Sequence, residues 1–429
     1  MPETTNNLIA LIQNHIRKPG ANLDSIARFL EEEEGFTRED GLELADAVCR
    51  KMTEELFPPI TEMELMLTED CNQRCDYCFV EGKNPSNPMN METAEKAVDL
   101  LFDLSRNNPD LKILLFGGEP MLAFDLIKDI VLYVEEKQAG SGQKVSFDMT
   151  TNGTLFDEVR ISFLAKHHVK YLLSIDGDQE THDLHRKSVD GKSSYLRIIR
   201  NLSLFKSYQP WLGARITVQP DTVDKIYNNV IHLAELGFNQ FLVGPATGVA
   251  WSNRGLDTYR DQMIQVTVWL KAELDKGRHF RINTLEESVS MMGGKINFWG
   301  CRAGRHSITV TARGTIFPCS KMLGVDNLEG ICPLGTIEEG IIEINNRLAL
   351  CGMVPVDRQT CLDCRWADTC MGGCFATNYQ ATGSLFSPDP FECRLKSRTM
   401  EIARAAEEIL GPEFFREPSE VQKRKSPTH

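Results

Sequence analysis

The sequence predicts an α/β fold, in which a core of parallel strands follows a helical segment and precedes a cysteine-rich domain. From residue 62 to residue 276, six short apolar runs alternate with six helical stretches. Polar motifs follow four of these runs, and nine of the thirteen cysteines lie between Cys301 and Cys393. Repeated strand–helix units give parallel strands with right-handed crossovers, so the core is either an incomplete barrel or a doubly wound sheet.

The first 60 residues are expected to be helical. Asn22 or Asp24 would cap one helix, and Thr37 begins a second helical pattern. Two consecutive prolines, Pro58 and Pro59, then interrupt the pattern. We therefore predict a helical N-terminal segment that ends where the strand–helix alternation begins.

The core is expected over residues 61–280. Its predicted strands are 62–67, 112–116, 145–150, 169–175, 213–218 and 240–244. Its predicted helices are 91–105, 123–136, 155–166, 195–207, 223–236 and 258–276. Because such folds place their chemistry at the carboxyl ends of the strands, the motifs that follow the first four strands are expected on one face.

The C-terminal part lacks the regular alternation of strands and helices. Residues 281–400 are expected to form a cysteine-rich domain with short strands at 307–311 and 314–317. A helix is expected near 396–409. Residues 401–429 are predicted to contain the end of that helix and then a polar, charged and proline-containing tail without stable structure.

Composition and charge exclude several classes of protein. The chain has 429 residues and a formal net charge of −14, so its bulk electrostatics do not favour nucleic acid or an anionic membrane. The N-terminus lacks a secretory signal pattern, and the apolar runs are too short to cross a bilayer. In the cytoplasm, which is the expected location, thirteen cysteines would stay reduced, and their clustering indicates metal ligation.

The first cysteine cluster follows the first predicted strand. Cys71, Cys75 and Cys78 have a CX3CX2C spacing. A loop can place three such thiolates around one face of a four-iron cubane, which leaves one iron open. An open coordination position is what a substrate or cofactor needs to reach a metal. The spacing alone leaves a zinc site or a redox-inert set of cysteines as the alternative.

This spacing in a six-repeat α/β domain resembles the radical S-adenosylmethionine (SAM) superfamily, whose core is a partial (β/α)6 TIM barrel. The resemblance implies that Tyr77 lies near the adenine of SAM. It also implies that oxygens of the GGEP motif, which begins with Gly117, Gly118 and Glu119, accept hydrogen bonds from the methionine amino group. Asn152, in TTNGT, either lines the same pocket or forms a turn.

A further stretch, SIDG at 174–177 and HDLHR at 182–186, resembles the sulfatase-maturating and peptide-maturating members. By that resemblance Ser174 and Arg186 contact SAM, and Arg186 pairs with its carboxylate. Taken alone, Ser174 would simply end a strand and Arg186 would make a surface ion pair. The implied chemistry is reductive cleavage of SAM to a 5′-deoxyadenosyl radical, which abstracts a hydrogen atom from an unactivated carbon.

The C-terminal cysteines form a second pattern. Cys301 and Cys319 are followed by a CX2CX5CX3C run and by Cys393. This pattern resembles the SPASM domain, which holds two auxiliary [4Fe–4S] clusters, and a zinc ribbon is the alternative. By that resemblance, four cysteines ligate an outer cluster and three ligate an inner one: Cys361, Cys364, Cys370 and Cys393, and Cys301, Cys319 and Cys374 respectively.

Two departures from the sulfatase-maturating pattern bear on the reaction. Residues 279–300 contain no cysteine, so the inner cluster either has an open iron, which we favour, or recruits Cys332 or Cys351. Otherwise these two cysteines, like Cys49, are small buried hydrophobes. Sulfatase-maturating members carry an aspartate where this chain has Ser320, and serine is not a comparable general base at neutral pH. This difference counts against formylglycine formation.

Together the resemblances imply an enzyme that abstracts a hydrogen atom from a residue of a ribosomally made precursor peptide, giving a thioether or carbon–carbon crosslink or an oxidation. A one-electron donor such as flavodoxin or ferredoxin would reduce it. Sulfatase maturation, oxidation of a small molecule and a non-catalytic zinc protein are the alternatives. The N-terminal helices would either help to bind a leader peptide or serve only in packing.

Overall fold

The computed structural model describes residues 11–12, 23–80, 88–293, 301–325, 331–351, 361, 363–367, 369–370, 372–385 and 387–416. The chain divides into two compact units, Met1–Pro58 and Pro59–His429. The prediction that the tail lacks stable structure is wrong at its start, where Pro412–Arg416 form the short helix α17, and the rest of the tail lies outside the described residues. No helix in the described part of the chain is long and apolar enough to cross a membrane.

The first unit contains two helices, α2 (Leu23–Glu34) and α3 (Arg38–Leu56). The predicted start at Thr37 is confirmed, because its hydroxyl accepts a hydrogen bond from the Asp40 N–H at 3.2 Å, as in an N-cap. Ile26 and Leu30 of α2 and Ala45 of α3 are buried in one small apolar cluster. The unit thus has a core of its own, although a small one.

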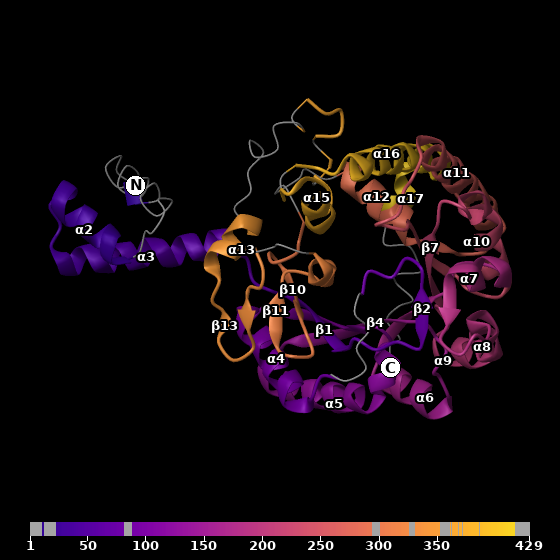
Figure 1. Cartoon of the computed structure of the whole chain (residues 1–429), viewed down its shortest axis with the longest axis horizontal. Coiled ribbons are helices and arrows are strands. Elements are labelled where there is room, and N and C mark those ends of the chain that lie inside the picture. The colour runs from indigo at the N-terminus through magenta and orange to yellow at the C-terminus, as the bar shows by residue number, and fades with distance from the viewer. Residues whose placement is uncertain are drawn as a thin grey trace. The chain divides into compact units, whose positions relative to one another are not determined.

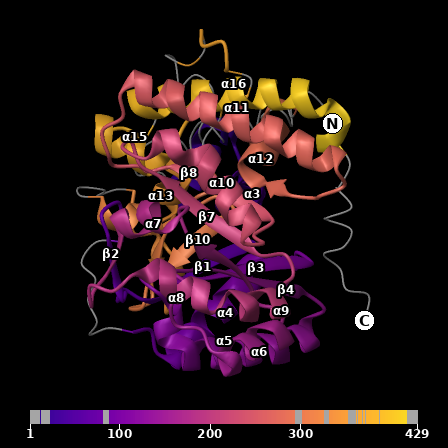
Figure 2. The same ribbon diagram turned by 90° about the vertical axis from the view of Figure 1, so that its right-hand side faces the viewer.

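The centre of the second unit is a parallel sheet whose strands pair in chain order. Its strands are β1 (Glu62–Thr68), β3 (Asp110–Gly117), β4 (Lys144–Thr151), β5 (Lys170–Ser174), β7 (Gly213–Val218), β8 (Gln240–Pro245) and β9 (Arg281–Ile282). A doubly wound sheet would reverse its strand order at a switch point, and this one does not. The sheet curves into an incomplete barrel with helices around its outside (Figures 1 and 2).

Helices connect successive strands along the outer surface of this barrel. They are α4 (Met91–Leu104), η1 (Pro120–Ala123), α5 (Phe124–Ser141), α6 (Glu158–Lys166), α7 (Gln179–His185), α8 (Ser194–Arg200), α9 (Leu202–Tyr208), η2 (Val223–Lys225), α10 (Ile226–Glu235) and α11 (Asn253–Asp275). Local signals fix several starts: Asn90, Asp157 and Ser252 each accept a backbone N–H from three residues ahead, as N-caps do.

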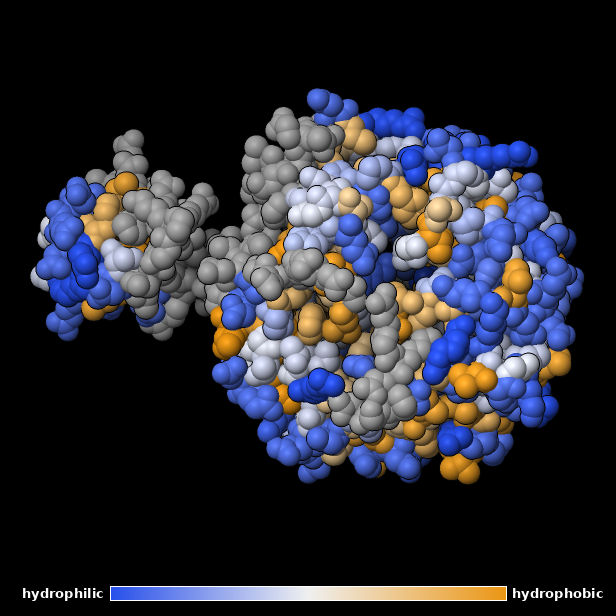
Figure 3. Space-filling view, in the orientation of Figure 1, coloured by the Kyte–Doolittle hydropathy of each residue, from blue (hydrophilic) through white to orange (hydrophobic). Residues whose placement is uncertain are grey.

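The two faces of the sheet differ in chemistry. Met63, Leu65 and Leu67 of β1 belong to the hydrophobic core that also contains residues of the outer helices. Because side chains alternate along a strand, Glu64 and Met66 point to the opposite face, which is the interior of the barrel. In Figure 3 the surface of the second unit is hollowed near its middle, and hydrophilic residues are visible inside the hollow.

The cysteine-rich part continues the same sheet. Strand β10 (Ser307–Val310) pairs in parallel with β1, and β11 (Thr315–Phe317), β12 (Gly335–Thr336) and β13 (Gly340–Ile341) follow as antiparallel neighbours. The helical elements of this part are α12 (Asn283–Gly293), η3 (Ser320–Gly324), α13 (Ile344–Cys351), α15 (Phe375–Thr382), α16 (Pro390–Leu410) and α17 (Pro412–Arg416). Helix α16 packs against α11 and α12. The border between core and cysteine-rich domain at residue 280 stays a prediction.

The predicted α/β fold is confirmed, and the incomplete barrel is the right one of its two forms. One predicted helix, 195–207, is broken into α8 and α9 at Asn201, whose side-chain amide donates to the carbonyl of Phe156 at 3.1 Å. A short two-stranded sheet, β2 (Gln73–Cys75) with β6 (Arg186–Ser188), was not predicted. Three-residue strands carry too little periodicity to be recognised from sequence.

Candidate active site

The loop that carries Cys71, Cys75 and Cys78 leaves the carboxyl end of β1 and forms β2 on its way. Strand β2 pairs antiparallel with β6, and Cys75 lies opposite Arg186 in this pairing. The backbone N–H of Cys78 donates to the carbonyl of Cys75 at 3.2 Å, which closes a tight turn between the two cysteines. Two predicted site residues from distant parts of the chain, Cys75 and Arg186, are thus neighbours.

Backbone and side-chain donors surround the buried Cys71. The Gln73 N–H lies 3.3 Å from its Sγ, and the Asn152 amide lies 3.9 Å from it. Donors aimed at sulfur favour the thiolate, which is the metal-ligating form. In the described part of the chain, no three His, Cys, Asp or Glu side chains converge tightly enough for a single ion. A cubane does not need that convergence, because each cysteine binds a different iron.

The GGEP motif is joined to this loop by its backbone. The Gly118 N–H donates to the carbonyl of Thr68, and the Glu119 N–H donates to the carbonyl of Asp70, each at 2.9 Å. A Cβ at Gly117, where φ is +148°, would lie 2.3 Å from the Thr68 oxygen, and one at Gly118 would lie 2.2 Å from the Asp70 oxygen. Only glycine permits this close approach of two backbones.

Replacing Gly118 with alanine is therefore expected to push the motif away from the cysteine loop. Overpacking of this kind costs about 1–3 kcal/mol, which urea unfolding would measure. The matched control is Gly140→Ala in α5, where nothing lies within 4 Å of the added Cβ. In the control, alanine is expected to stabilise the helix by up to about 1 kcal/mol. Equal stabilities of the two variants would contradict the close approach.

Glu119 ties three elements together. Its Oε1 accepts from the Thr151 hydroxyl at 2.6 Å and from the Met121 N–H at 3.1 Å, and its Oε2 accepts from the Asn152 N–H at 2.7 Å. A carboxylate has about four acceptor positions, so Oε2 retains room for the amino group that the resemblance assigns to it. Burial raises the pKa of Glu119 to about 7, although these hydrogen bonds lower it.

A raised carboxyl pKa makes stability depend on pH. In the unfolded chain Glu119 ionises near 4.5, and in the folded protein near 7, so the wild type loses stability as pH rises through that window. The loss attributable to this group would reach about 3 kcal/mol above pH 7. Urea unfolding across pH 4.5–8 should show that Glu119→Gln lacks this slope, whatever constant offset its altered hydrogen bonds add. Parallel profiles would refute the shift.

Asn152 forms the turn that was one of its two predicted alternatives, and its place in a SAM pocket stays a prediction. Its Oδ1 accepts the Thr154 N–H at 3.0 Å, which makes a local turn. Its Nδ2 points to Cys71 Sγ and donates to Asn72 Oδ1 at 2.7 Å, so the side chain also lines the cysteine loop.

A buried ion pair lies next to the cysteine loop, and one of its members was missed from sequence. Arg186 donates through Nε and Nη2 to the two carboxylate oxygens of Asp176 at 2.8 and 2.9 Å. Tyr77 donates its hydroxyl to the same carboxylate at 2.6 Å, and the guanidinium lies 5.3 Å from the Tyr77 ring centroid. Two of the three guanidinium nitrogens are thus engaged, and the predicted pairing of Arg186 with a SAM carboxylate would use Nη1.

The charged and neutral side chains of this group stabilise one another's protonation states. Despite burial, the Arg186 cation and other donors hold the pKa of Asp176 below its usual value, so the carboxyl is ionised. Burial lowers the pKa of His182 to about 4, so its imidazole is neutral. His182 Nδ1 accepts the Asp176 N–H at 3.3 Å, and its Nε2 is left to donate to the Ser194 hydroxyl at 2.9 Å. The SIDG signal contained Asp176, but spacing could not show that it faces Arg186.

Ser174 ends β5 on the interior face of the barrel. Its register partner on β7 is Arg215, which was not predicted as a site residue. The Arg215 guanidinium reaches over Gly244, where an added Cβ would lie 3.1 Å from Nη1. Strands β5, β7 and β8 thus bring a hydroxyl and a second cation to the same side of the barrel as Arg186.

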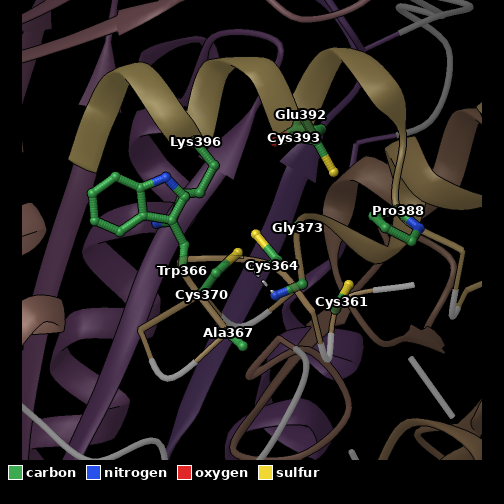
Figure 4. A pocket seen from close by; sticks show the side chains of 11 residues that line it. Cys361, Cys364, Trp366, Ala367, Cys370, Gly373, Pro388, Glu392, Cys393 and Lys396 are labelled. Atoms are coloured by element: carbon green, nitrogen blue, oxygen red, sulfur yellow. Dashed lines mark hydrogen bonds between the residues drawn. The ribbon is translucent and has the colours of Figure 1, made fainter. Parts of the chain in front are cut away.

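The four cysteines assigned to the outer cluster lie around one hollow of roughly 460 Å³, its open mouth included. Cys393 comes from α16, and Cys361, Cys364 and Cys370 come from the preceding segment (Figure 4). Burial and repulsion from the other three thiolates raise the pKa of Cys393 to about 11. A bound metal centre would offset that repulsion, so the donor set fits a cluster.

The three cysteines assigned to the inner cluster also lie near one another. Burial and the neighbouring Cys374 and Cys301 thiolates raise the pKa of Cys319 to about 12. Cys332 donates to Met322 Sδ at 3.7 Å, and Cys351 donates to the carbonyl of Gly304 at 3.5 Å. These contacts are those of packed thiols, and the open iron of the inner cluster stays a prediction.

Comparisons with known proteins show what the chain is similar to. The chain is 21% identical to the radical SAM cyclopropyl synthase TigE of Paramaledivibacter caminithermalis over 364 residues, which cover 78% of this chain and 72% of TigE. It is 25% identical to the cysteine-type anaerobic sulfatase-maturating enzyme of Clostridium perfringens over 337 residues, which cover 74% of this chain and 89% of that enzyme.

Solved structures share the fold. Native anSMEcpe with bound AdoMet and Cp18Cys peptide superposes with a TM-score of 0.65 at 19% identity, covering 86% of this chain and 100% of that chain. Streptococcus suis SuiB bound to precursor peptide SuiA superposes with a TM-score of 0.59 at 18% identity, covering 91% of this chain and 88% of that chain. Residues 65–234 match the radical SAM superfamily profile. Residues 65–234 thus form a radical SAM domain, and over most of its length the chain is similar to sulfatase-maturating enzymes and to a cyclopropyl synthase of the radical SAM type.

Proposed function

We propose that this protein is a cytoplasmic SAM-dependent maturase that abstracts a hydrogen atom from a residue of a ribosomally made precursor peptide. The observation that carries the proposal is the joining of three motifs beside the barrel interior: the cysteine loop, GGEP and the Asp176–Arg186 pair. When bound at such a site, a [4Fe–4S] cluster and SAM supply a 5′-deoxyadenosyl radical, which removes a hydrogen atom from an unactivated carbon.

Each part of the site has a role in this proposal. Cys71, Cys75 and Cys78 would hold the cluster. Arg186 and Ser174 would bind the carboxylate of SAM, and Glu119 would bind its amino group. The aromatic ring of Tyr77 would border the adenine. The hydrogen bonds of Asp176, Thr151 and Asn152 fix these side chains in place before any ligand arrives, which lowers the entropic cost of binding.

The C-terminal cysteines would hold two auxiliary [4Fe–4S] clusters, in the outer and inner sets defined above. A flavodoxin- or ferredoxin-like protein would supply electrons. The grouping of thiols in each set supports this assignment, because clustered thiolates repel one another until a metal offsets their charge.

A peptide substrate is supported by the comparisons. The solved structures of anSMEcpe and SuiB were determined with peptides bound, and TigE is named for a cyclopropyl product. Sulfatase maturation is the second candidate, supported by the Clostridium perfringens relative. Ser320 counts against it, since a serine cannot replace the aspartate of those enzymes as a base. We therefore favour a crosslink or another oxidation of a precursor peptide.

The test is coexpression with each short open reading frame that lies beside the gene, followed by mass spectrometry of the peptide. We expect the peptide to lose two hydrogens and to gain a crosslink that resists fragmentation. In parallel, the anaerobically reconstituted protein should release 5′-deoxyadenosine when it receives dithionite and SAM. Release of 5′-deoxyadenosine without modification of any neighbouring peptide, but with oxidation of a sulfatase peptide, would favour the second candidate. No release at all would refute both.

A further inference from the structure

One acidic side chain in the barrel interior has no role in the site described so far. Glu64 lies in the middle of β1, between Met63 and Leu65, which both face the hydrophobic core. Its carboxylate therefore points to the interior. Its register partner on β10 is Thr309, which lies between the core residues Ile308 and Val310 and so faces the same way.

Only neutral groups hold the Glu64 carboxylate. The Thr309 hydroxyl donates to its Oε2 at 2.7 Å, and the hydroxyl and backbone N–H of Ser320 lie close enough to lower its pKa. No ion pair with Glu64 is present among the described residues. The other carboxylates of the same region are paired: Asp148 lies 2.6 Å from Lys112 Nζ, and Glu62 lies 3.1 Å from Arg302 Nη2.

This environment makes Glu64 a stronger base than an exposed carboxylate. Burial raises its pKa, and the hydrogen bonds from Thr309 and Ser320 offset only part of that effect. Taking a carboxylate into a low-dielectric interior without a cation is costly, and accepting a proton relieves that cost. The hydrogen bond from Thr309 nevertheless orients the carboxylate, so the side chain is positioned as well as basic.

The contact with Ser320 places this carboxylate beside the inner cysteines. Ser320 follows Cys319 directly in the chain and begins η3. A carboxylate at position 320 would lie beside the carboxylate of Glu64, because the Ser320 hydroxyl is already near enough to lower the Glu64 pKa. In this chain, the carboxylate near position 320 is therefore that of Glu64, which belongs to β1.

We propose that Glu64 is the proton acceptor of the barrel interior, taking a proton from an N–H, O–H or S–H group of the peptide residue under modification. The O–H bond forms at a Glu64 oxygen as the substrate bond to hydrogen breaks, and the electron pair of that bond stays on the substrate. The proton later leaves to solvent. This inference rests on the proposed function and adds to it a residue that acts on the substrate.

The decisive variant is Glu64→Gln, which keeps the size and one acceptor but removes the base. In the coexpression assay it should form product at least about 10²-fold more slowly, while 5′-deoxyadenosine is still released. The matched control is Glu62→Gln, on the same strand and face, which removes a half-exposed ion pair and should change the rate less than about twofold. Adding Ser320→Asp to Glu64→Gln returns a carboxylate to this place and should restore at least about tenfold of the loss.

A second readout needs no peptide. Because its folded pKa is raised, Glu64 destabilises the wild type progressively as pH rises from the unfolded value of 4.5. The groups that face it are the hydroxyls of Thr309 and Ser320, and the charged pair of the neighbouring strands is Lys112–Asp148. The stability difference between Glu64→Gln and wild type should therefore grow with pH in urea unfolding.

The outcomes separate this inference from the proposed function. If the wild type modifies no peptide, the proposed function fails, and the unfolding profiles decide about Glu64. If Glu64→Gln forms product at the wild-type rate, or if its unfolding profile runs parallel to that of the wild type, the inference is overturned. Iron content and melting temperature establish that the variant folds. If it does not fold, Glu64→Asp must fold and retain product formation, or the inference is equally overturned.

Discussion

Replacing Asp176 with asparagine should destabilise the protein by about 3–5 kcal/mol, the largest stability loss expected from any single polar substitution here. The substitution keeps the volume but leaves the Arg186 guanidinium buried without a counter-ion. The side chains of Arg186 and Asp176 are 7% and 3% exposed, so water cannot replace the lost carboxylate. Tyr77 would lose its partner at the same time. Urea unfolding at neutral pH measures the change.

The matched control is Asp125→Asn, which removes the partner of Lys128. That pair has the same separation, 2.8 Å, but its side chains are 91% and 39% exposed. Its loss should cost little stability, because solvent screens an exposed pair. If the two variants lose equal stability, burial does not govern the Asp176–Arg186 pair. A stable Asp176→Asn protein that binds SAM as tightly as the wild type would also remove the positioning role of Asp176.

The second large effect concerns the two sets of cysteines. Cys75→Ala should abolish 5′-deoxyadenosine release, since a cubane needs three protein thiolates to hold its fourth iron open. Cys393→Ala is the matched control, because it removes one ligand of the outer set and leaves the Cys71–Cys78 loop intact. It should lower the iron content by up to one cluster while SAM cleavage with dithionite persists.

Iron analysis and quantification of 5′-deoxyadenosine distinguish the possible results. If Cys393→Ala loses no iron, the outer set does not ligate a cluster. If Cys75→Ala still cleaves SAM, the CX3CX2C loop is not the site of cleavage and the proposed function fails. Zinc in place of iron in the anaerobically purified wild type would establish the non-catalytic alternative.

Much of the fold was predictable because its long elements have strong periodicity. The apolar runs at 62–67, 213–218 and 240–244 correspond to β1, β7 and β8 with almost unchanged limits. The incomplete barrel was predicted only through the resemblance to the radical SAM superfamily and not from the apolar pattern, because strand order depends on pairing between distant segments. Strands β2 and β6 were not predicted, because three residues are too few to show the alternation of a strand.

The residues of the candidate site also divide into those that the sequence could identify and those that only the structure reveals. Motifs with fixed spacing, such as the three cysteines of the first loop, could be singled out from sequence. Asp176 and Glu64 could not, because a buried acid is recognised by what surrounds it: the guanidinium of Arg186 in one case and the hydroxyls of Thr309 and Ser320 in the other. Thr309, for example, lies 245 positions away from Glu64 along the chain.

The pairing of β10 with β1 has a consequence for biosynthesis. One edge of β1 stays open until the segment Ser307–Val310 has emerged from the ribosome. At the usual 5–20 residues per second, the 245 positions that separate Glu64 from Thr309 correspond to roughly 12–50 seconds of translation. During that interval an apolar parallel strand is exposed to other nascent chains. A chaperone that covers β1, or slow initiation that spaces ribosomes apart on the messenger, would therefore raise the yield of soluble protein.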